Sequence, residues 1–418
     1  MLQLIMFASV LALLIGLFFL FLPVGWSKHW LTSQSLVGGV LVDYLMPDLW
    51  FQDLLAATLI LALIRQKTIS VQFQLFSVGL GLIFLQLGHS PWPPLSLIQL
   101  ARLLLALSLA SGLNQLVQQK PRFRQPILLG LSLSNLWVLA LSLGQLIKQK
   151  TVLGWWFLGE PLFSPGLSQI KTLSLLGHRL ITPLATFPHS NVLAAFALFS
   201  FLRLKKSNPT GWIKLGFIAS GLNLLLSGSI FTQITALISL TFDSPRKRTL
   251  WLGWIILIVL IFGLQPLQPL SWKRRQELIS AASQMIKTHP FWGVGWGFFV
   301  AQLPRFWPAQ LGPRFLQPVH HLFLLILSEL GLVGSLGLAL ISRALLRFRF
   351  SLKSLLPLLL LASFDHYFWT TTQGVYLFWL WLNSTSSAFR PSWSKATNLT
   401  RARAARSNAR GRTRRKGK

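Results

Sequence analysis

The sequence LFLLILSELGLVGSLGLALIS occupies residues 322–342 and contains a single charged residue, Glu329. An α-helix of about 20 apolar residues is long enough to cross the hydrocarbon core of a bilayer. This stretch therefore predicts a transmembrane helix. Over the whole chain, 53% of the residues are hydrophobic and 11% are charged, whereas an ordinary soluble domain has about 25% charged residues. The sequence indicates an all-α, polytopic integral membrane protein.

Similar apolar runs recur along the chain, and from them we expect about twelve transmembrane helices. The first run has no charge before it and no small-residue cleavage site after it, so we interpret it as a retained helix rather than a signal peptide. No internal repeat of fixed period is visible, which argues against an inverted-repeat transporter. The runs lie near residues 2–22, 50–64, 70–88, 96–115, 126–147, 191–204, 211–226, 228–242, 249–264, 322–342, 353–365 and 373–385.

Positive charge is unevenly distributed along the chain. Lys and Arg number 39 against eight Asp and Glu, a net charge of +31, and the basic residues gather in short connections and in the tail 390–418. When the predicted helices alternate, these basic segments fall on one side, which the positive-inside rule makes cytoplasmic together with both termini. Two long connections, about 148–190 and 265–321, then face outward. We expect a membrane domain, 1–389, and a disordered tail that lies on anionic lipid, with no nucleic-acid partner.

Metal and thiol chemistry are not indicated by the residue pattern. The chain has no cysteine, its eight acids form no D-x-D pair, and its eight histidines lack H-x-x-x-H or similar zinc-site spacing. We therefore expect neither a metal nor another cofactor. On the predicted topology all eight histidines lie on the outer side.

The second long connection contains the most specific motif. Residues 275–297 read RQELISAASQMIKTHPFWGVGWG, and residues 317–334 read QPVHHLFLLILSELGLVG. This pattern resembles the O-antigen ligase and polymerase superfamily of membrane glycosyltransferases. In that family the outer loop has an Arg-led helix, an H-P-x-x-G-x-G-x-G turn, and a His-Asn pair that opens a helix with E-x-G-x-x-G.

Two further blocks support the resemblance. Residues 179–191 read RLITPLATFPHSN and residues 365–374 read DHYFWTTTQG, and both are similar to segments of some bacterial members. The ligase-like core then spans about 179–385. The sequence departs from the family pattern at four positions, with His321 for the usual Asn, Ile230 for an expected Arg, Ala185 for a Gly and Ser190 for a Pro.

The residues themselves give partial support to a site for an anion. Residues 272–287 predict an amphipathic helix with Arg275 on the stripe of Leu278, Ile279, Ala282, Met285 and Ile286. An Arg on this stripe predicts an anion or a buried carboxylate as its partner, and the alternative is a snorkelling side chain. Arg102 lies inside the fourth apolar run and is our best substitute for the missing Arg. We expect Glu329 to be a buried partner of an Arg rather than a base.

The resemblance implies transfer of a glycan from a polyprenyl-diphosphate carrier to a hydroxyl of a lipid or glycan acceptor, at the outer face of the cytoplasmic membrane and without metal. Arg275, Arg102 and Arg179 would bind the diphosphate. His320 would be the base or orient the acceptor, with His321 beside it in the catalytic pair. We assign substrate binding also to three more residues, His189, Asp365 and His366.

Two alternatives stay open. A polymerase that extends the same carrier-linked glycan would use every residue named above. A transporter or flippase for a lipid-linked or anionic solute belongs to a different class. It would be favoured by charged or broken helices near the membrane midplane in both halves of the chain, and these are scarce.

Overall fold

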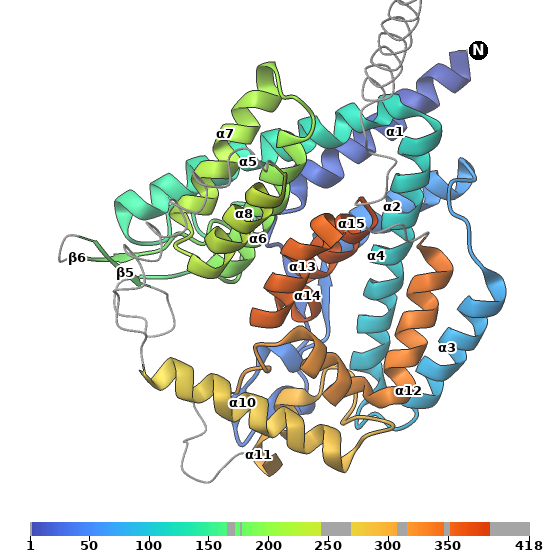
Figure 1. Cartoon of the computed structure of the whole chain (residues 1–418), viewed down its shortest axis with the longest axis vertical. Coiled ribbons are helices and arrows are strands. Elements are labelled where there is room, and N and C mark those ends of the chain that lie inside the picture. The colour runs from blue at the N-terminus through green and yellow to red at the C-terminus, as the bar shows by residue number, and fades with distance from the viewer. Residues whose placement is uncertain are drawn as a thin grey trace, which may run out of the picture.

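A computed structural model describes residues 2–164, 172–175, 178–243, 269–306, 316–346 and 352–384. Within these ranges the chain is mainly helical (Figure 1). The helices are α1 (Leu2–Phe21), α2 (Phe51–Arg65), α3 (Phe73–Leu87), α4 (Pro93–Gln119), α5 (Arg124–Lys148), α6 (Ser190–Lys205), α7 (Gly211–Leu226), α8 (Ile230–Asp243), α10 (Pro269–Thr288), α11 (Phe299–Phe306), α12 (Leu322–Leu345), α13 (Leu352–Phe364), α14 (Tyr367–Thr370) and α15 (Thr372–Ser384).

The predicted apolar runs correspond to these helices. Each predicted run within the described ranges coincides with one helix, whereas the run 249–264 lies outside the described residues. By length and composition, three helical segments of the described chain can cross a membrane: Pro93–Gln119, Pro121–Lys148 and Leu322–Leu345. Five more apolar segments are shorter, from 10 to 17 residues. The predominantly helical class is confirmed, and the number of transmembrane helices stays a prediction.

Short antiparallel strand pairs occupy the connections between helices. β1 (Ser27–His29) pairs with β4 (Asp48–Trp50), and β2 (Leu36–Val37) pairs with β3 (Val40–Leu41), both between α1 and α2. β5 (Thr172–Leu175) pairs with β6 (His178–Ile181) in the connection before α6. These strands were not predicted from the sequence, because such short segments carry no periodic hydrophobic pattern of useful length.

Most of the helices form two groups, and α13, α14 and α15 lie between these groups (Figure 1). One group contains α1, α5, α6, α7 and α8, and the other contains α2, α3, α4 and α12. Small residues permit close helix packing in both groups. A Cβ atom on Gly130 of α5 would lie 2.5 Å from the carbonyl oxygen of Gly16 in α1, and one on Gly79 of α3 would lie 2.8 Å from that of Gly337 in α12.

A break in α12 explains the glycine-rich turn of the sequence. Gly331 has φ +60° and ψ −168° inside this helix. At the break, the backbone N–H of Val294 donates to Ser328 O at 2.9 Å, and that of Val333 donates to Phe291 O at 3.0 Å. The turn around residues 290–297 therefore supplies the hydrogen-bond partners that the interrupted helix lacks. This pairing fixes the first half of α12, which begins beside the candidate site.

Candidate active site

The candidate site lies where five segments of the chain meet. These are the start of α6, the turn before α8, the first turns of α10, the start of α12, and the link between α13 and α14 (Figure 1). They contribute Asn191, Ser229, Arg275, His320 and Asp365 respectively. The three motif blocks, in residues 179–191, 275–334 and 365–374, are far apart in the sequence and meet at this site.

Asp365 is the centre of this arrangement. Its Oδ2 accepts a hydrogen bond from Asn191 Nδ2 at 2.8 Å, and its Oδ1 accepts one from the backbone N–H of His366 at 2.8 Å. His320 Nδ1 lies 3.4 Å from the same Oδ1. Burial alone would raise the pKa of Asp365, but the hydrogen bond from His320 and the electrostatic interactions with the neighbouring histidine side chains lower it well below its usual range. Asp365 is therefore an ionised carboxylate.

The contact with Asp365 fixes the tautomer of His320. An ionised carboxylate only accepts hydrogen bonds, so Nδ1 of His320 carries the proton and donates it to Asp365. In the neutral imidazole, Nε2 of His320 then has a lone pair. The side chain of His320 is 22% exposed, which leaves it accessible from outside.

His366 is buried behind this pair. Its Nδ1 lies 2.8 Å from Thr370 Oγ1, and the hydroxyl of Thr370 donates to the carbonyl of His366 at 3.3 Å. With the Thr370 proton on the His366 carbonyl, Nδ1 of His366 is the donor to Thr370 Oγ1. Burial lowers the pKa of His366 to about 3, against the opposing effect of the Asp365 charge, so the ring is neutral near pH 7. Tyr44 contacts this ring edge-on, with centroids 5.9 Å apart.

His320, Asp365 and His366 could together hold a metal ion. One ligand atom from each lies within 4.8 Å of the others. Nε2 of His366 is 3.9 Å from Asp365 Oδ1, and Nδ1 of His366 contacts Thr370. A hydrogen bond to the second ring nitrogen also orients metal-ligating histidines. Sequence spacing could not reveal this set because 45 residues separate His320 from Asp365.

Arg275 lies at the edge of the same site. Its Nη1 donates to the carbonyl of Phe364 at 3.2 Å, one residue before Asp365. The helix that presents it, α10, buries Leu278, Ala282 and Met285, as predicted from the stripe, whereas Ile279 is 41% exposed. The partner shown in the structure is a backbone carbonyl rather than a carboxylate. The charge of Arg275 still reaches the site, since it is the smallest of the effects that lower the pKa of His366, after burial, His320 and His189.

The segment before α6, residues 179–191, contributes a helix cap and a link to α8. His189 is exposed, and its Nδ1 accepts from the backbone N–H of Asn191 at 3.0 Å. Asn191 Oδ1 in turn accepts from Ser229 Oγ at 3.0 Å. Neither Asn191 nor Ser229 was predicted from the sequence as a site residue, because neither is titratable. Arg179 lies on β6, and its side chain is outside the described part of the structure.

His321 has a different position from its neighbour. Its Nδ1 accepts from the backbone N–H of Leu324 at 3.3 Å, so His321 is the N-cap of α12. Partial burial lowers the pKa of His321. His321 therefore caps the start of α12. No contact of His321 with Asp365 is seen among the described residues, so the geometry does not support its predicted catalytic role.

Arg102 forms ion pairs with Asp48 and Asp53, and no contact joins it to Asp365 among the described residues. Its Nη2 lies 2.7 Å from Asp48 Oδ1 and 3.0 Å from Asp53 Oδ2, and the hydroxyl of Tyr376 donates to Asp53 at 3.0 Å. Two carboxylates therefore neutralise this buried guanidinium. The geometry gives no support to the predicted role of Arg102 in diphosphate binding.

Glu329 is buried as predicted, but its partner is not an arginine. Its Oε2 accepts from the indole N–H of Trp369 at 2.8 Å, and its Oε1 accepts from the backbone N–H of Phe299 at 3.3 Å. Glu329 thereby ties α11 and α14 to the break in α12. The expected Arg partner is wrong, and the expected structural role agrees with these contacts.

Comparison with family models finds a match to part of the chain. Residues 185–339 match the family model described as O-Antigen ligase. The resemblance to the O-antigen ligase superfamily is confirmed. The matched O-antigen ligase domain includes Asn191, Ser229, Arg275 and His320, and it ends before Asp365. No curated protein and no solved structure matches the chain. The domain and the apolar helices support a membrane protein of glycosyltransferase type.

Proposed function

We propose that this protein is a membrane glycosyltransferase of O-antigen ligase type. It transfers a glycan from a polyprenyl-diphosphate carrier to a hydroxyl of a lipid or glycan acceptor, at the outer face of the cytoplasmic membrane and without a metal. The observation that carries this proposal is the hydrogen-bonded pair of His320 and Asp365, with the cation of Arg275 beside it.

His320 is the general base in this mechanism. Its Nε2 takes the proton from the acceptor hydroxyl while the acceptor oxygen bonds to the anomeric carbon of the glycan. The bond between that carbon and the carrier diphosphate breaks, and its electron pair goes to the diphosphate oxygen. Asp365 holds the ring through Nδ1 and stabilises the imidazolium that forms, as the carboxylate does in a Ser-His-Asp triad.

Arg275 stabilises the leaving diphosphate. A guanidinium has five N–H donors, and the hydrogen bond to Phe364 uses only one of them. A bidentate contact with phosphate oxygens would neutralise the charge that develops as the diphosphate leaves. Arg179 remains a second candidate for this contact. Arg102 is left out because Asp48 and Asp53 already bind it.

The proposal is tested with purified protein in lipid vesicles, a carrier-linked glycan and a hydroxyl acceptor. His320→Ala should lower the transfer rate by about 10²–10⁴-fold with little change in carrier binding. His321→Asn is the matched control, and it should transfer nearly normally because Asn is also a good N-cap. Normal transfer by His320→Ala would overturn the base assignment.

The same assay separates the neighbouring possibilities. EDTA should leave transfer unchanged, whereas loss of transfer that Zn²⁺ restores would make His320, Asp365 and His366 metal ligands. A polymerase would elongate the carrier-linked glycan when no other acceptor is present, and a ligase would require the separate acceptor. Carrier movement without any transfer would indicate a flippase.

A further inference from the structure

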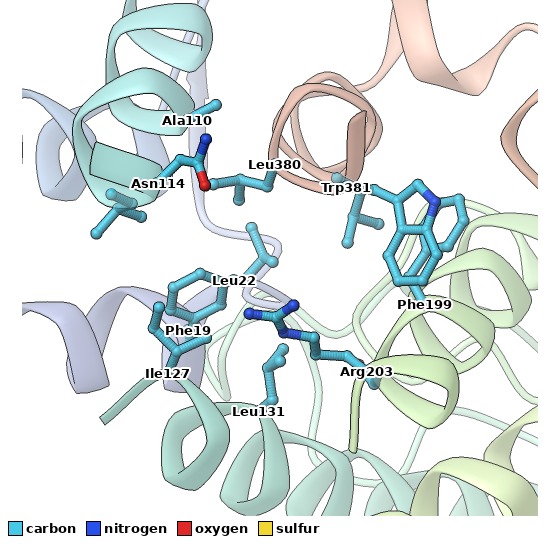
Figure 2. A pocket seen from close by; sticks show the side chains of 13 residues that line it. Phe19, Leu22, Ala110, Asn114, Ile127, Leu131, Phe199, Arg203, Leu380 and Trp381 are labelled. Carbon is cyan, nitrogen blue, oxygen red and sulfur yellow. The ribbon is translucent and has the colours of Figure 1, made fainter. Parts of the chain in front are cut away.

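A second candidate binding site lies in a pocket away from the Asp365 cluster. Helices α1, α4, α5, α6 and α15 surround it, and its empty volume is about 590 Å³, part of it open to the outside. The walls are mainly apolar, with Phe19, Leu131, Phe199 and Leu380 among them (Figure 2). Pockets with mainly apolar walls and a few polar groups commonly bind molecules with a large apolar part.

Two polar groups of α6 interrupt the apolar wall. Arg203 is 8% exposed, and its guanidinium points into the middle of the pocket (Figure 2). Ser200, one turn earlier, is 2% exposed, and its Oγ finds no hydrogen-bond partner among the described residues. Burying a hydroxyl without a hydrogen-bond partner destabilises the folded protein, and a hydrogen bond to a ligand oxygen would offset that cost.

The surroundings of Arg203 are positively charged. The charge of Arg124 acts on Arg203, and Arg124 Nη2 donates to the carbonyl of Lys206 at 3.5 Å. Lys206 Nζ lies 5.9 Å from the ring centroid of Trp381, which also lines the pocket. The residues that line the pocket include no Asp or Glu. The summed positive charge of these side chains attracts an anion to this end of the pocket.

We propose that this pocket binds one acidic phospholipid. Its acyl chain lies between the apolar walls, and its phosphate contacts Arg203 and Ser200. A phosphate attached to an apolar chain matches both the polar groups and the apolar walls of the pocket. Basic residues close to the membrane attract acidic lipids in particular.

This lipid site is separate from the candidate active site. The 1.5 Å rise per residue of an α-helix puts Arg203 about 18 Å from Asn191 along α6. The residues that hold Asp365 do not line the pocket. The lipid is therefore a bound component that joins five helices, and this inference does not depend on the glycosyltransferase proposal.

The test uses the full chain in a neutral detergent and a short-chain phosphatidylglycerol as the probe. The midpoint of thermal unfolding is measured with this lipid, with the phosphatidylcholine of the same chain length, and with inorganic phosphate. We expect phosphatidylglycerol to raise the midpoint in a saturable way. Phosphatidylcholine and inorganic phosphate should have much smaller effects, because one lacks the net charge and the other lacks the acyl chain.

Two substitutions assign the effect to this pocket. Arg203→Gln should weaken the apparent affinity for phosphatidylglycerol by roughly tenfold or more, since a charge-assisted contact is lost. Arg343→Gln, at an exposed arginine near the end of α12, is the matched control and should bind normally. Ala110→Leu, which adds three carbon atoms to the pocket wall, should weaken binding through the acyl chain and keeps the test valid if Arg203→Gln does not fold.

Three results would overturn the proposal. The first is an equal stabilisation by phosphatidylcholine, which would mean that charge does not matter. The second is full stabilisation by inorganic phosphate, which would mean an anion site without an acyl chain. The third is unchanged phosphatidylglycerol affinity in the folded Arg203→Gln and Ala110→Leu proteins.

Discussion

Nδ1 of His320 lies 3.4 Å from Oδ1 of Asp365, although 45 residues separate the two in the chain. His320 stands at the entrance to α12, and Asp365 stands between α13 and α14. The contact therefore depends on how three helices pack, and it joins the O-antigen ligase domain to a segment beyond its matched residues. Its chemical consequence is a histidine with a defined tautomer and an accessible Nε2.

The first prediction tests this contact. Asp365→Asn removes the negative charge that stabilises the His320 imidazolium, and an amide can still accept the Nδ1–H. We expect the transfer rate to fall on the order of 10²-fold with carrier binding retained. Asp43→Asn, at an exposed carboxylate, is the control and should transfer normally. If Asp365→Asn instead loses carrier binding with an unchanged rate at saturation, Asp365 belongs to the carrier site.

Helix positions followed directly from the sequence, and tertiary contacts did not. Each apolar run in the described ranges became one helix because a run of apolar residues in a bilayer has few other conformations that satisfy its backbone hydrogen bonds. The partners of charged residues were unpredictable by the same reasoning. Arg102 on α4 pairs with Asp48 and Asp53, which precede or begin α2, and no local spacing relates these positions.

Single residues of the site were predicted from the sequence, but the contacts between them were not. His320, Asp365 and His366 were each selected from a motif, and the structure places them in contact. The link through Asn191 and Ser229 was missed because uncharged polar residues look like ordinary helix caps in a sequence. His321 was selected for its place beside His320, yet successive residues point in different directions at a helix start, and its ring caps α12.

The second prediction concerns Arg275. Arg275→Lys should lower transfer by roughly 10- to 100-fold while the protein inserts normally, because an ammonium is a point charge and cannot form the bidentate phosphate contact. Arg274→Lys is the matched control one residue away on the same helix. Near wild-type turnover of Arg275→Lys would show that the residue only holds the Phe364 carbonyl.

The third prediction concerns stability as a function of pH. The pKa of His366 is about 3 in the folded protein because of burial, and an unfolded histidine has a pKa of about 6.5. Between these values the unfolded chain binds more protons than the folded one, so folding stability falls as the pH falls below about 6.5. One such group contributes at most about 1.4 kcal/mol per pH unit.

His366→Gln tests this contribution, because glutamine can still donate to Thr370 and does not titrate. The midpoint of thermal unfolding is measured from pH 7.5 to pH 4.5 for both proteins. We expect the wild type to lose more stability on acidification than His366→Gln. Parallel curves would show that His366 is not held neutral in the folded protein.

The fourth prediction concerns the break in α12. Gly331→Ala should destabilise the protein by roughly 1–3 kcal/mol, since its φ of +60° is strained for alanine and the new methyl group would meet the carbonyl of Phe291. Gly81→Ala is the control, because Gly81 is inside α3 and has open space around its Cβ position. That change should be neutral or slightly stabilising. Equal thermal midpoints for the two variants would remove the glycine requirement at the break.

The last prediction concerns orientation, on which the outer position of the site depends. The positive-inside rule places the basic tail in the cytoplasm and α10, with Arg275, outside. The chain has no cysteine, so a single introduced thiol gives no background. Cysteine at Gln284, an exposed position on α10, should react with a membrane-impermeant thiol reagent in intact cells, and cysteine at Ser407 should react only after the cells are permeabilised. The reverse pattern would put Arg275, His320 and Asp365 on the cytoplasmic face. There the carrier glycan would have to be bound before it crosses the membrane, and the proposed transfer at the outer face would be wrong.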